Sequence, residues 1–211
     1  MSIKKVVKYG DETLRRPSKE VSKISKKIQT LVHDLLDTMY AKNGVGLAAP
    51  QIVENMLRVF VIDVSTGNEP LHPMVFINPK IIKKSGAVSS YEGCLSFPDA
   101  YTDVKRYANV MVKALDIHGK PFTIEGKDGS LLARAIQHEF DHLDGVLFID
   151  HCRNRFEADK ILSEHGLAPV EGDRILDEPE LDKALESIPA NPGETVLPEG
   201  QNSQKEDEKV D

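Results

Sequence analysis

The chain has 211 residues, of which 40% are hydrophobic and 29% charged, and its formal net charge is −7. This composition is typical of a globular domain, and no apolar run approaches the roughly 18 residues that a membrane span needs. The charge is uneven, with 13 acidic and 4 basic residues in 166–211 against 21 acidic and 23 basic in 1–165. Because nucleic-acid binding needs a clustered basic face, this near-neutral larger part predicts no direct nucleic-acid partner, and we expect no membrane partner either.

The N-terminal residues and the number of cysteines indicate the cellular compartment of the protein. Residues 1–5 (MSIKK) lack the longer apolar stretch and the small-residue cleavage site of a signal peptide. Two cysteines, Cys94 and Cys152, are too few for a disulfide framework. We therefore expect a cytoplasmic protein and favour a monomer.

The first predicted element is a helix over residues 11–43. Apolar residues recur there at steps of three and four, and Asn43-Gly44 is a stop signal. The stripe consists of Ile24, Ile28, Leu31, Leu35 and Met39. Residues 44–51 (GVGLAAPQ) then form a small, apolar segment in which Pro50 argues against a continued helix.

The middle of the chain predicts strands. Short β-branched and aromatic runs are typical of strands, and a turn at 116–120 joins the last two into a hairpin. The predicted strands cover residues 59–64, 74–77, 108–115 and 121–124.

Turn and N-cap residues at 127–130 predict that a helix begins at Leu131 and runs to Leu143. A short strand at 147–149 and a helix over 153–165, ended by a glycine, are expected next.

Residues 166–211 differ in character from the rest. Prolines interrupt each potential element, at positions 169, 179, 189, 192 and 198. A short amphipathic helix is predicted within 173–188, and from about residue 190 the composition is typical of disorder.

The predicted helix over 131–143 carries the first chemical signal, the segment 138–142 (HEFDH). Four residues along a helix bring two side chains to one face, so both imidazoles of His138 and His142 can reach one ion. Glu139 lies beside the first ligand, where a carboxylate can reach a metal-bound water without being a ligand. A solvated, charge-rich helix end is the alternative interpretation of so short a pattern.

The helix face favours metal binding. Leu131, Ala135, His138 and His142 follow one another at steps of four, three and four, so the histidines continue an apolar stripe. Burying an unsatisfied imidazole costs roughly 1–3 kcal/mol, which a metal would offset for both rings. The alternative is a pair of core histidines bonded to backbone carbonyls.

A catalytic site needs a third protein ligand and leaves the fourth position to water. Candidates are Cys94, Cys152 and any acidic residue or histidine from elsewhere. Cys94 follows Gly93, which leaves the backbone free for a tight bend or a close ligand. Cys152 fits better as a small buried hydrophobic residue.

Three segments together resemble the signature segments of bacterial peptide deformylases: 44–51 (GVGLAAPQ), 92–96 (EGCLS) and 137–145 (QHEFDHLDG). They stand in the family's order and at about its spacing. The resemblance implies an α+β fold in which a central metal-bearing helix packs among mainly antiparallel β-sheets, with an N-terminal and a C-terminal helix. It implies a catalytic domain in 1–165. The composition beyond that domain predicts an acidic, proline-interrupted extension in 166–211 that is largely disordered.

The resemblance also implies roles for single residues. Cys94, His138 and His142 match the metal ligands, and Glu139 matches the general acid/base. Gln51 and the backbone N–H of Leu95 match the groups that polarise the formyl oxygen. Val45, Gly46 and Gly93 match positions that pair with the substrate backbone. Val45, Leu131, Ala135 and the rim of His138 are candidates for the pocket that holds methionine.

The implied activity is hydrolysis of the formyl group from N-formyl-methionyl nascent polypeptides, which are the expected partners, at the ribosome. Water activated by the metal attacks the formyl carbon, and formate leaves. The family commonly uses one ferrous iron, and zinc, nickel or cobalt can occupy such a site. Ligand identity alone does not choose among these metals.

The sequence departs from the family at two positions. Arg134 stands where many members have an apolar residue, and Tyr101 stands where a common form has a basic one. Asp141 and Asp144 are expected to face solvent or to bond locally, with the orientation of a histidine as the alternative. Arg106 is expected to contact acidic groups near the site or to form a surface pair. An ordinary metallopeptidase and a purely structural metal site remain the alternative functions.

Overall fold

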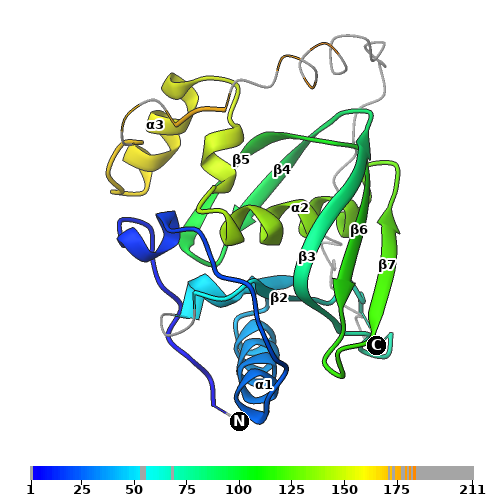
Figure 1. Ribbon diagram of the computed structural model, residues 1–211. Helices are drawn as coiled ribbons and strands as arrows, with labels where there is room; N and C mark the ends of the chain where they lie inside the picture. Colours follow the sequence, from blue (N-terminus) through cyan, green and yellow to red (C-terminus); the bar gives the residue numbers. More distant parts are fainter. Residues whose placement is uncertain are drawn as a thin grey trace, which may run out of the picture.

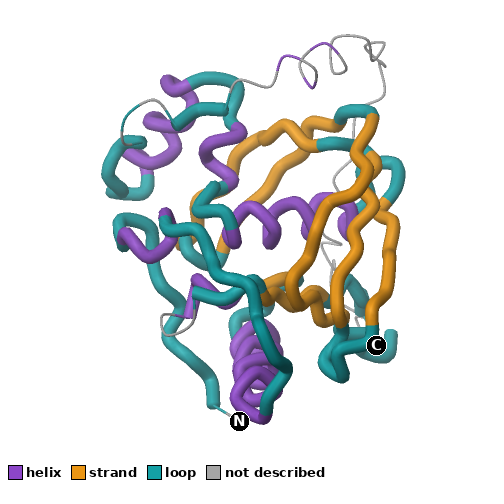
Figure 2. The backbone as a smooth tube through the Cα atoms, viewed as in Figure 1, coloured by secondary structure: helices purple, strands orange, loops and turns teal. Residues whose placement is uncertain are grey.

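The structure, a computed structural model, describes residues 2–52, 56–67, 69–170, 172, 174–176, 179, 181 and 183 (Figures 1 and 2). The helices are η1 (Glu12–Arg15), α1 (Lys26–Ala41), η2 (Ala49–Ile52), α2 (Leu131–Leu143), η3 (Phe148–His151) and α3 (Arg155–Glu164), where η denotes a 3₁₀ helix. The strands are β1 (Gly46–Ala48), β2 (Val59–Ile62), β3 (Met74–Ser85), β4 (Val88–Cys94), β5 (Phe97–Arg106), β6 (Asn109–Leu115) and β7 (Pro121–Gly126).

The fold is α+β, as the sequence predicts. Five antiparallel strands form one sheet in the order β1-β2-β3-β6-β7, and β4 and β5 form a separate hairpin. Helix α2 crosses the middle of the molecule, as Figure 1 shows, and contacts β1, β2, β6 and β7. Helix α1 packs on β1 and β2. The central helix therefore lies where both sheets can bring side chains to it.

Local sequence explains the bounds of α2. The Ser130 hydroxyl caps the helix by accepting from the N–H of Ala133 at 3.3 Å. The face with Ala135, His138 and His142 is buried, as the apolar stripe predicts. Gly145 follows the C-cap with φ of +73°, a conformation that glycine adopts without strain. The predicted helix over 131–143 is thus confirmed at both ends.

The predicted helix over residues 11–43 is wrong in its middle part. Only η1 and α1 are helical, and the chain between them is not. Pro17 disfavours helical geometry at the preceding residue. The backbone there bonds instead to distant segments: the N–H of Lys19 donates to Met56 O at 2.8 Å, and the N–H of Val21 donates to Asn78 Oδ1 at 2.7 Å.

The predicted strand at 147–149 is also wrong, because this segment begins η3. The Asp150 carboxylate accepts from the N–H of Leu147 at 2.9 Å and pairs with Arg15 at 2.5 Å, and these contacts hold a tight turn. The other predicted strands are confirmed, although β3 runs on to Ser85 past a register shift. The β4–β5 hairpin is an element that the local pattern did not predict.

Beyond α3, several described residues belong to the packed structure. Val170 and Leu181 are each 1% exposed, and the N–H of Leu176 donates to Asp150 O at 2.9 Å. Most of the helix predicted within 173–188, and all of the disorder predicted from about residue 190, lie outside the described residues. Among the helices that the structure describes, none is both long and apolar enough to cross a membrane.

The contact between β7 and α2 gives a test of this packing. A Cβ at Gly126 would lie 2.5 Å from Ala133 Cα and 2.7 Å from Ala133 N, and backbone cannot yield without moving the helix. We expect Gly126→Ala to lower the free energy of unfolding by about 1–3 kcal/mol in urea denaturation. Thr123→Ala, at an exposed position of the same strand, should cost less than about 1 kcal/mol. Equal stability of Gly126→Ala and the parent would contradict the close contact.

Candidate metal centre and active site

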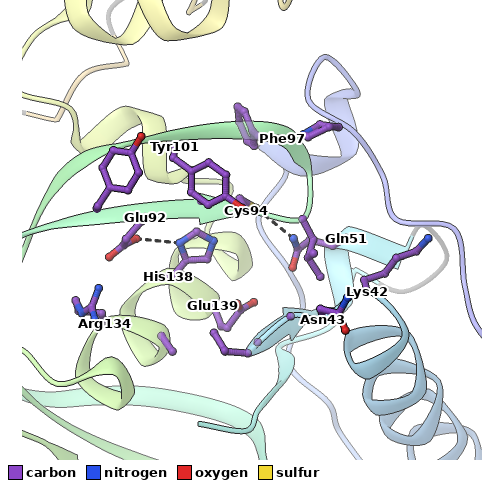
Figure 3. Close-up of a pocket in the computed structure, with 18 of the residues that line it drawn as sticks. Lys42, Asn43, Gln51, Glu92, Cys94, Phe97, Tyr101, Arg134, His138 and Glu139 are labelled. Atoms are coloured by element: carbon purple, nitrogen blue, oxygen red, sulfur yellow. Dashed lines mark hydrogen bonds and ion pairs between the residues drawn. The ribbon is translucent and has the colours of Figure 1, made fainter. Parts of the chain in front are cut away.

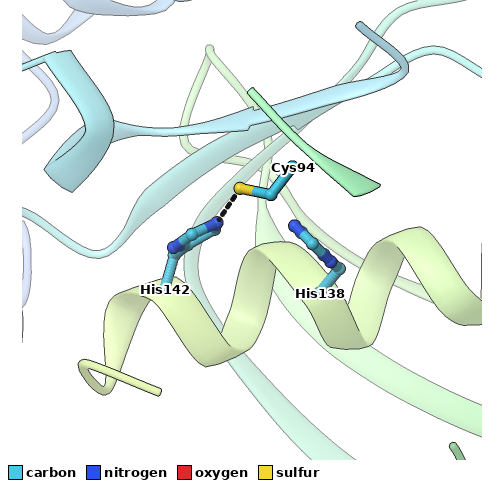
Figure 4. Close-up of side chains that lie close together, drawn as sticks. All are labelled: Cys94, His138 and His142. Atoms are coloured by element: carbon cyan, nitrogen blue, oxygen red, sulfur yellow. Dashed lines mark hydrogen bonds between the residues drawn. The ribbon is translucent and has the colours of Figure 1, made fainter. Parts of the chain in front are cut away.

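Cys94, at the end of β4, meets His138 and His142 of α2 (Figure 4). Cys94 Sγ lies 3.3 Å from His142 Nε2, and one ligand atom from each of the three residues lies within 4.8 Å of the others. Of the candidates for a third ligand, the structure therefore selects Cys94. Cys152 is buried elsewhere, near Thr102, and burial raises the pKa of its thiol to about 11.

The donor chemistry of this cluster fits a divalent metal. Burial alone would raise the pKa of the Cys94 thiol, but the neighbouring His142 and His138 imidazoles hold it well below its usual range. A thiolate is the form that binds metal. Among the described residues, no further histidine, cysteine or carboxylate joins the three, which leaves a coordination position for water or substrate.

Glu92 fixes the orientation of His138. His138 Nδ1 lies 3.1 Å from Glu92 Oε2, and since a carboxylate only accepts, Nδ1 carries the hydrogen. The other ring nitrogen, Nε2, is then the one available to a metal. Although burial alone would raise the pKa of Glu92, Arg106 and His138 lower it to about 2, so the carboxylate is ionised at neutral pH.

Arg106 extends this network behind the ligands. Its guanidinium, 1% exposed, donates to Glu92 Oε1 at 3.1 Å and to Glu92 Oε2 at 2.9 Å, and it donates to Asp141 Oδ2 at 2.5 Å. The first of the two alternatives for Arg106, contact with acidic groups near the site, is confirmed. The expectation that Asp141 faces solvent or bonds only locally is wrong, because its partners are Arg106 and His151, the latter at 2.8 Å. Asp144 forms an ion pair with Arg58, the residue that directly precedes β2.

Gln51 presents its amide nitrogen to the cluster. The N–H of Ala48 donates to Gln51 Oε1 at 2.9 Å, which leaves Nε2 pointing to the other side. Nε2 donates to Ser96 Oγ at 3.1 Å and lies 3.5 Å from Cys94 Sγ. Backbone contact with Ala48 thus sets which end of the amide faces the metal cluster.

Glu139 is the buried carboxylate of the cavity. Its Oε2 atom has no hydrogen-bond partner within the part of the chain that the structure describes. Burial raises the pKa of Glu139 to about 7. Gly46 makes room for this side chain, since a Cβ there would lie 2.4 Å from Glu139 Oε1.

These groups share one pocket with a volume of about 460 Å³ (Figure 3). The residues that the sequence predicts for the site and that line this pocket are Val45, Gly46, Gln51, Gly93, Cys94, Leu95, Leu131, Ala135, His138 and Glu139. His142 is 1% exposed and is the buried member of the metal cluster, outside the residues that line the pocket. The structure therefore brings the predicted residues from three segments to one place.

Tyr101 and Arg134, the two departures from the family, also line this pocket. Tyr101 faces Gly93 across the β4–β5 hairpin, and a Cβ at Gly93 would lie 2.3 Å from the Tyr101 ring. Its ring stacks on Tyr91 with centroids 5.8 Å apart. Arg134 Nε donates to Gly129 O at 3.1 Å. In Figure 3, Arg134 and Lys42 lie at opposite ends of the pocket.

Sequence reasoning missed Glu92 as an orienting residue, together with the link from Asp141 to Arg106. Glu92 lies in the second signature segment, directly before Gly93, but nothing local distinguishes it from an exposed strand residue. Its partners Arg106 and His138 lie 14 and 46 residues away along the chain. Only the pairing of β4 with β5 and their packing on α2 reveal the role.

The fold and the site define a metallohydrolase: a Cys/His/His ligand set, a buried carboxylate and a fixed amide face one pocket beside a central helix. A family profile described as polypeptide deformylase matches residues 3–157. Peptide deformylase 1 of Clostridium perfringens is 47% identical over 151 residues, which are 72% of this chain and 99% of the relative. Peptide deformylase 1 of Clostridium acetobutylicum is 49% identical over 150 residues, 71% of this chain and 95% of the relative.

Solved structures agree with this assignment. A peptide deformylase from Synechococcus elongatus in complex with actinonin has a TM-score of 0.72 and 41% identity, covering 78% of this chain and 91% of that one. A class I type b peptide deformylase from Acinetobacter baumannii with Met-Ala-Ser bound has a TM-score of 0.67 and 31% identity, covering 72% and 99%. The chain belongs to the peptide deformylase family. It is a hydrolase with peptide deformylase activity, and it acts in N-terminal processing during protein synthesis.

The contact between Gly46 and Glu139 can be tested. Because a Cβ at position 46 would lie 2.4 Å from Glu139 Oε1, Gly46→Ala should displace the carboxylate within the pocket. We expect kcat for a formyl-Met peptide to fall by about 100-fold, the typical effect of misplacing a reacting group by 1 Å. Metal content and the urea unfolding midpoint are the controls and should change little, since a flexible side chain yields. Unchanged kcat in the variant would contradict the positioning role of Gly46.

Proposed function

We propose that the chain removes the formyl group from N-formyl-methionyl nascent polypeptides with Glu139 as general acid/base. In this proposal Cys94, His138 and His142 hold one divalent metal, which is ferrous iron in the cell. The observation that carries it is the convergence of a Cys/His/His cluster, a buried carboxylate and the Gln51 amide on one pocket. Zinc, nickel or cobalt would satisfy the same three donors.

A metal on these ligands supplies Lewis acidity, which lowers the pKa of a bound water and polarises a carbonyl oxygen. Glu139 accepts the proton of the attacking water and delivers it to the leaving amine. Burial raises the pKa of this carboxylate toward the range in which one group can both accept and release a proton near neutral pH. Gln51 Nε2 and the N–H of Leu95 donate to the oxygen on which negative charge develops.

The substrate peptide lies in extended form along the pocket. Val45, Gly46 and Gly93 pair with its backbone, and the two glycines allow close approach because no side chain intervenes. Leu131 and Ala135 of α2 form the apolar wall for the methionine side chain. A peptide deformylase from Acinetobacter baumannii has been solved with Met-Ala-Ser bound, which supports a peptide that begins with methionine as the substrate. Tyr101 covers Gly93 and contacts the residues that follow methionine.

The setting of the reaction follows from the substrate. We place the enzyme in the cytoplasm, on chains that emerge from the ribosome, and we favour a monomer. Residues 1–165 form the proposed catalytic domain, and the family match over 3–157 lies within it. Residues 166–211 form the proposed acidic extension.

Two alternative functions are weaker. A closed structural metal site needs neither a buried carboxylate beside its ligands nor an amide aimed at them, and both are present. An ordinary metallopeptidase would cleave internal bonds of an unformylated peptide. Formate release from formyl-Met peptides, without cleavage of internal bonds, separates the proposed function from both.

Replacing the proposed acid/base tests the mechanism directly. Glu139→Ala should reduce formate release from a formyl-Met peptide by about 100-fold to 10,000-fold, because Glu92, the other buried carboxylate that lines the pocket, is held by Arg106 and His138. Metal content, measured by elemental analysis, should stay at the level of the parent since Glu139 is not a ligand. Glu125→Ala, which removes a carboxylate on β7, is the matched control and should keep full activity. A metal-loaded, folded parent that releases no formate would contradict the proposed function itself.

Charges at the pocket mouth predict a substrate preference. Lys8, Lys42 and Arg134 line the mouth together with one exposed acid, Asp99, while Glu92 is neutralised by Arg106. We expect kcat/KM for formyl-Met-Ala-Asp to exceed that for formyl-Met-Ala-Lys by about twofold to fivefold, the range of exposed charge pairs. The ratio should approach one in 0.5 M salt and should fall in Lys42→Glu. A ratio below one at low salt would refute the preference.

A further inference from the structure

A continuous chain of buried and partly buried polar contacts runs from the metal cluster to His151. His138 Nδ1 lies 3.1 Å from Glu92 Oε2, and Arg106 joins Glu92 to Asp141. Asp141 Oδ2 lies 2.8 Å from His151 Nε2. The groups come from four elements, since His138 and Asp141 belong to α2, Glu92 to β4, Arg106 to β5 and His151 to η3. His151 is itself buried, with 6% of its surface exposed.

His151 donates to an oxygen that already accepts a hydrogen bond from Arg106. Asp141 Oδ2 accepts from both Arg106 Nη1 and His151 Nε2, so two donors from different elements hold one oxygen. A carboxylate with two fixed donors cannot rotate without breaking one of the bonds. Losing a hydrogen bond to an ionised group destabilises a protein more where the group is shielded from water than where water can replace the lost donor. Loss of His151 would therefore loosen Asp141 and, through it, the guanidinium of Arg106.

The position of Arg106 matters for the metal cluster. Two of its nitrogens grip both oxygens of Glu92, and one of these oxygens, Oε2, also meets His138. A shift of the guanidinium therefore moves the carboxylate that sets the ring orientation of His138. Groups that orient a ligand histidine typically change metal affinity by about 10-fold to 100-fold when they are removed. Four contacts separate His151 from His138, so a smaller effect of the same kind is expected.

We propose that His151 is a positioning residue of the metal centre, which acts through Asp141, Arg106 and Glu92 to hold His138 in the orientation that retains the metal. This inference rests on the proposed metal site formed by Cys94, His138 and His142. It assigns to η3 a role beyond packing. The alternative role for His151 is purely structural, as a contact that joins η3 to α2.

Metal retention separates the two roles. The full chain is loaded with zinc, and zinc release to an excess of a chromogenic chelator is timed at a temperature where circular dichroism shows each variant folded. We expect His151→Phe to release zinc about threefold to tenfold faster than the parent. His151→Gln keeps an N–H donor near the position of Nε2 and should stay closer to the parent. His118→Phe, at an exposed turn position, is the matched control and should release zinc at the parent's rate.

A double-variant cycle tests the route of the effect. If His151 acts through Glu92, then adding His151→Phe to Glu92→Gln should accelerate release much less than it does in the parent. Release from His151→Phe at the parent's rate, with only a lower unfolding temperature, would overturn the proposal in favour of the structural role. Should His151→Phe fail to fold, His151→Ala, which also removes the donor and adds no bulk, takes its place: faster release than the parent supports the proposal, and release at the parent's rate overturns it. A parent chain that retains no zinc and releases no formate would instead refute the proposed function.

Discussion

The guanidinium of Arg106 is buried between two carboxylates that come from different parts of the chain. Glu92 reaches it from β4 and Asp141 from α2, and both pairs are within hydrogen-bond distance. Burying an unpaired cation would cost several kcal/mol, so the arrangement is stable only when both carboxylates are in place. The hairpin that carries Cys94 is thereby held against the helix that carries His138 and His142. Formation of the three-residue metal cluster depends on this pairing.

The pairing of Arg106 with Glu92 and Asp141 also explains how a stable fold can hold an unsatisfied carboxylate at the reaction site. On one side of His138 the charges of Glu92, Arg106 and Asp141 satisfy one another in the interior. On the other side lie Cys94 and the pocket, where the Glu139 carboxylate is buried with one oxygen unpaired among the described residues. An unsatisfied buried carboxylate is destabilising, and its retention at this place is consistent with a catalytic role. The ion pairs among Glu92, Arg106 and Asp141 stabilise the fold and offset the destabilising effect of burying the Glu139 carboxylate.

Close approach of backbone is the second constraint on the site. Gly46 lies against Glu139, and Gly93 lies under the ring of Tyr101, at distances that no side chain would permit. The backbone also positions Gln51, because the N–H of Ala48 donates to its side-chain oxygen and so sets the orientation of the amide. Gly46 and Gly93 are therefore required by geometry, since each makes room for a neighbour that lines the pocket.

Some features could be predicted from the sequence because their causes are local. Turn and N-cap residues and an apolar stripe predicted α2, and helical spacing alone placed His138 and His142 on one face. Identification of Cys94 needed more, because spacing along the chain left several candidates for the third ligand. The resemblance to known signature segments supplied that choice, and the contact with His142 in the structure agrees with it.

The sequence by itself thus determined the central helix, its histidine pair and, through three signature segments, the family to which the chain belongs. Only the tertiary structure decided that Asp141 turns inward to Arg106 and His151, that residues 147–149 enter a 3₁₀ turn, and that β4 and β5 form a hairpin. The physical reason is the range of the interactions. Helix caps and stripes involve residues a few positions apart. The partners that decide the roles of Glu92, Asp141 and Asp150 lie between 10 and 135 residues away and become neighbours only when the chain packs.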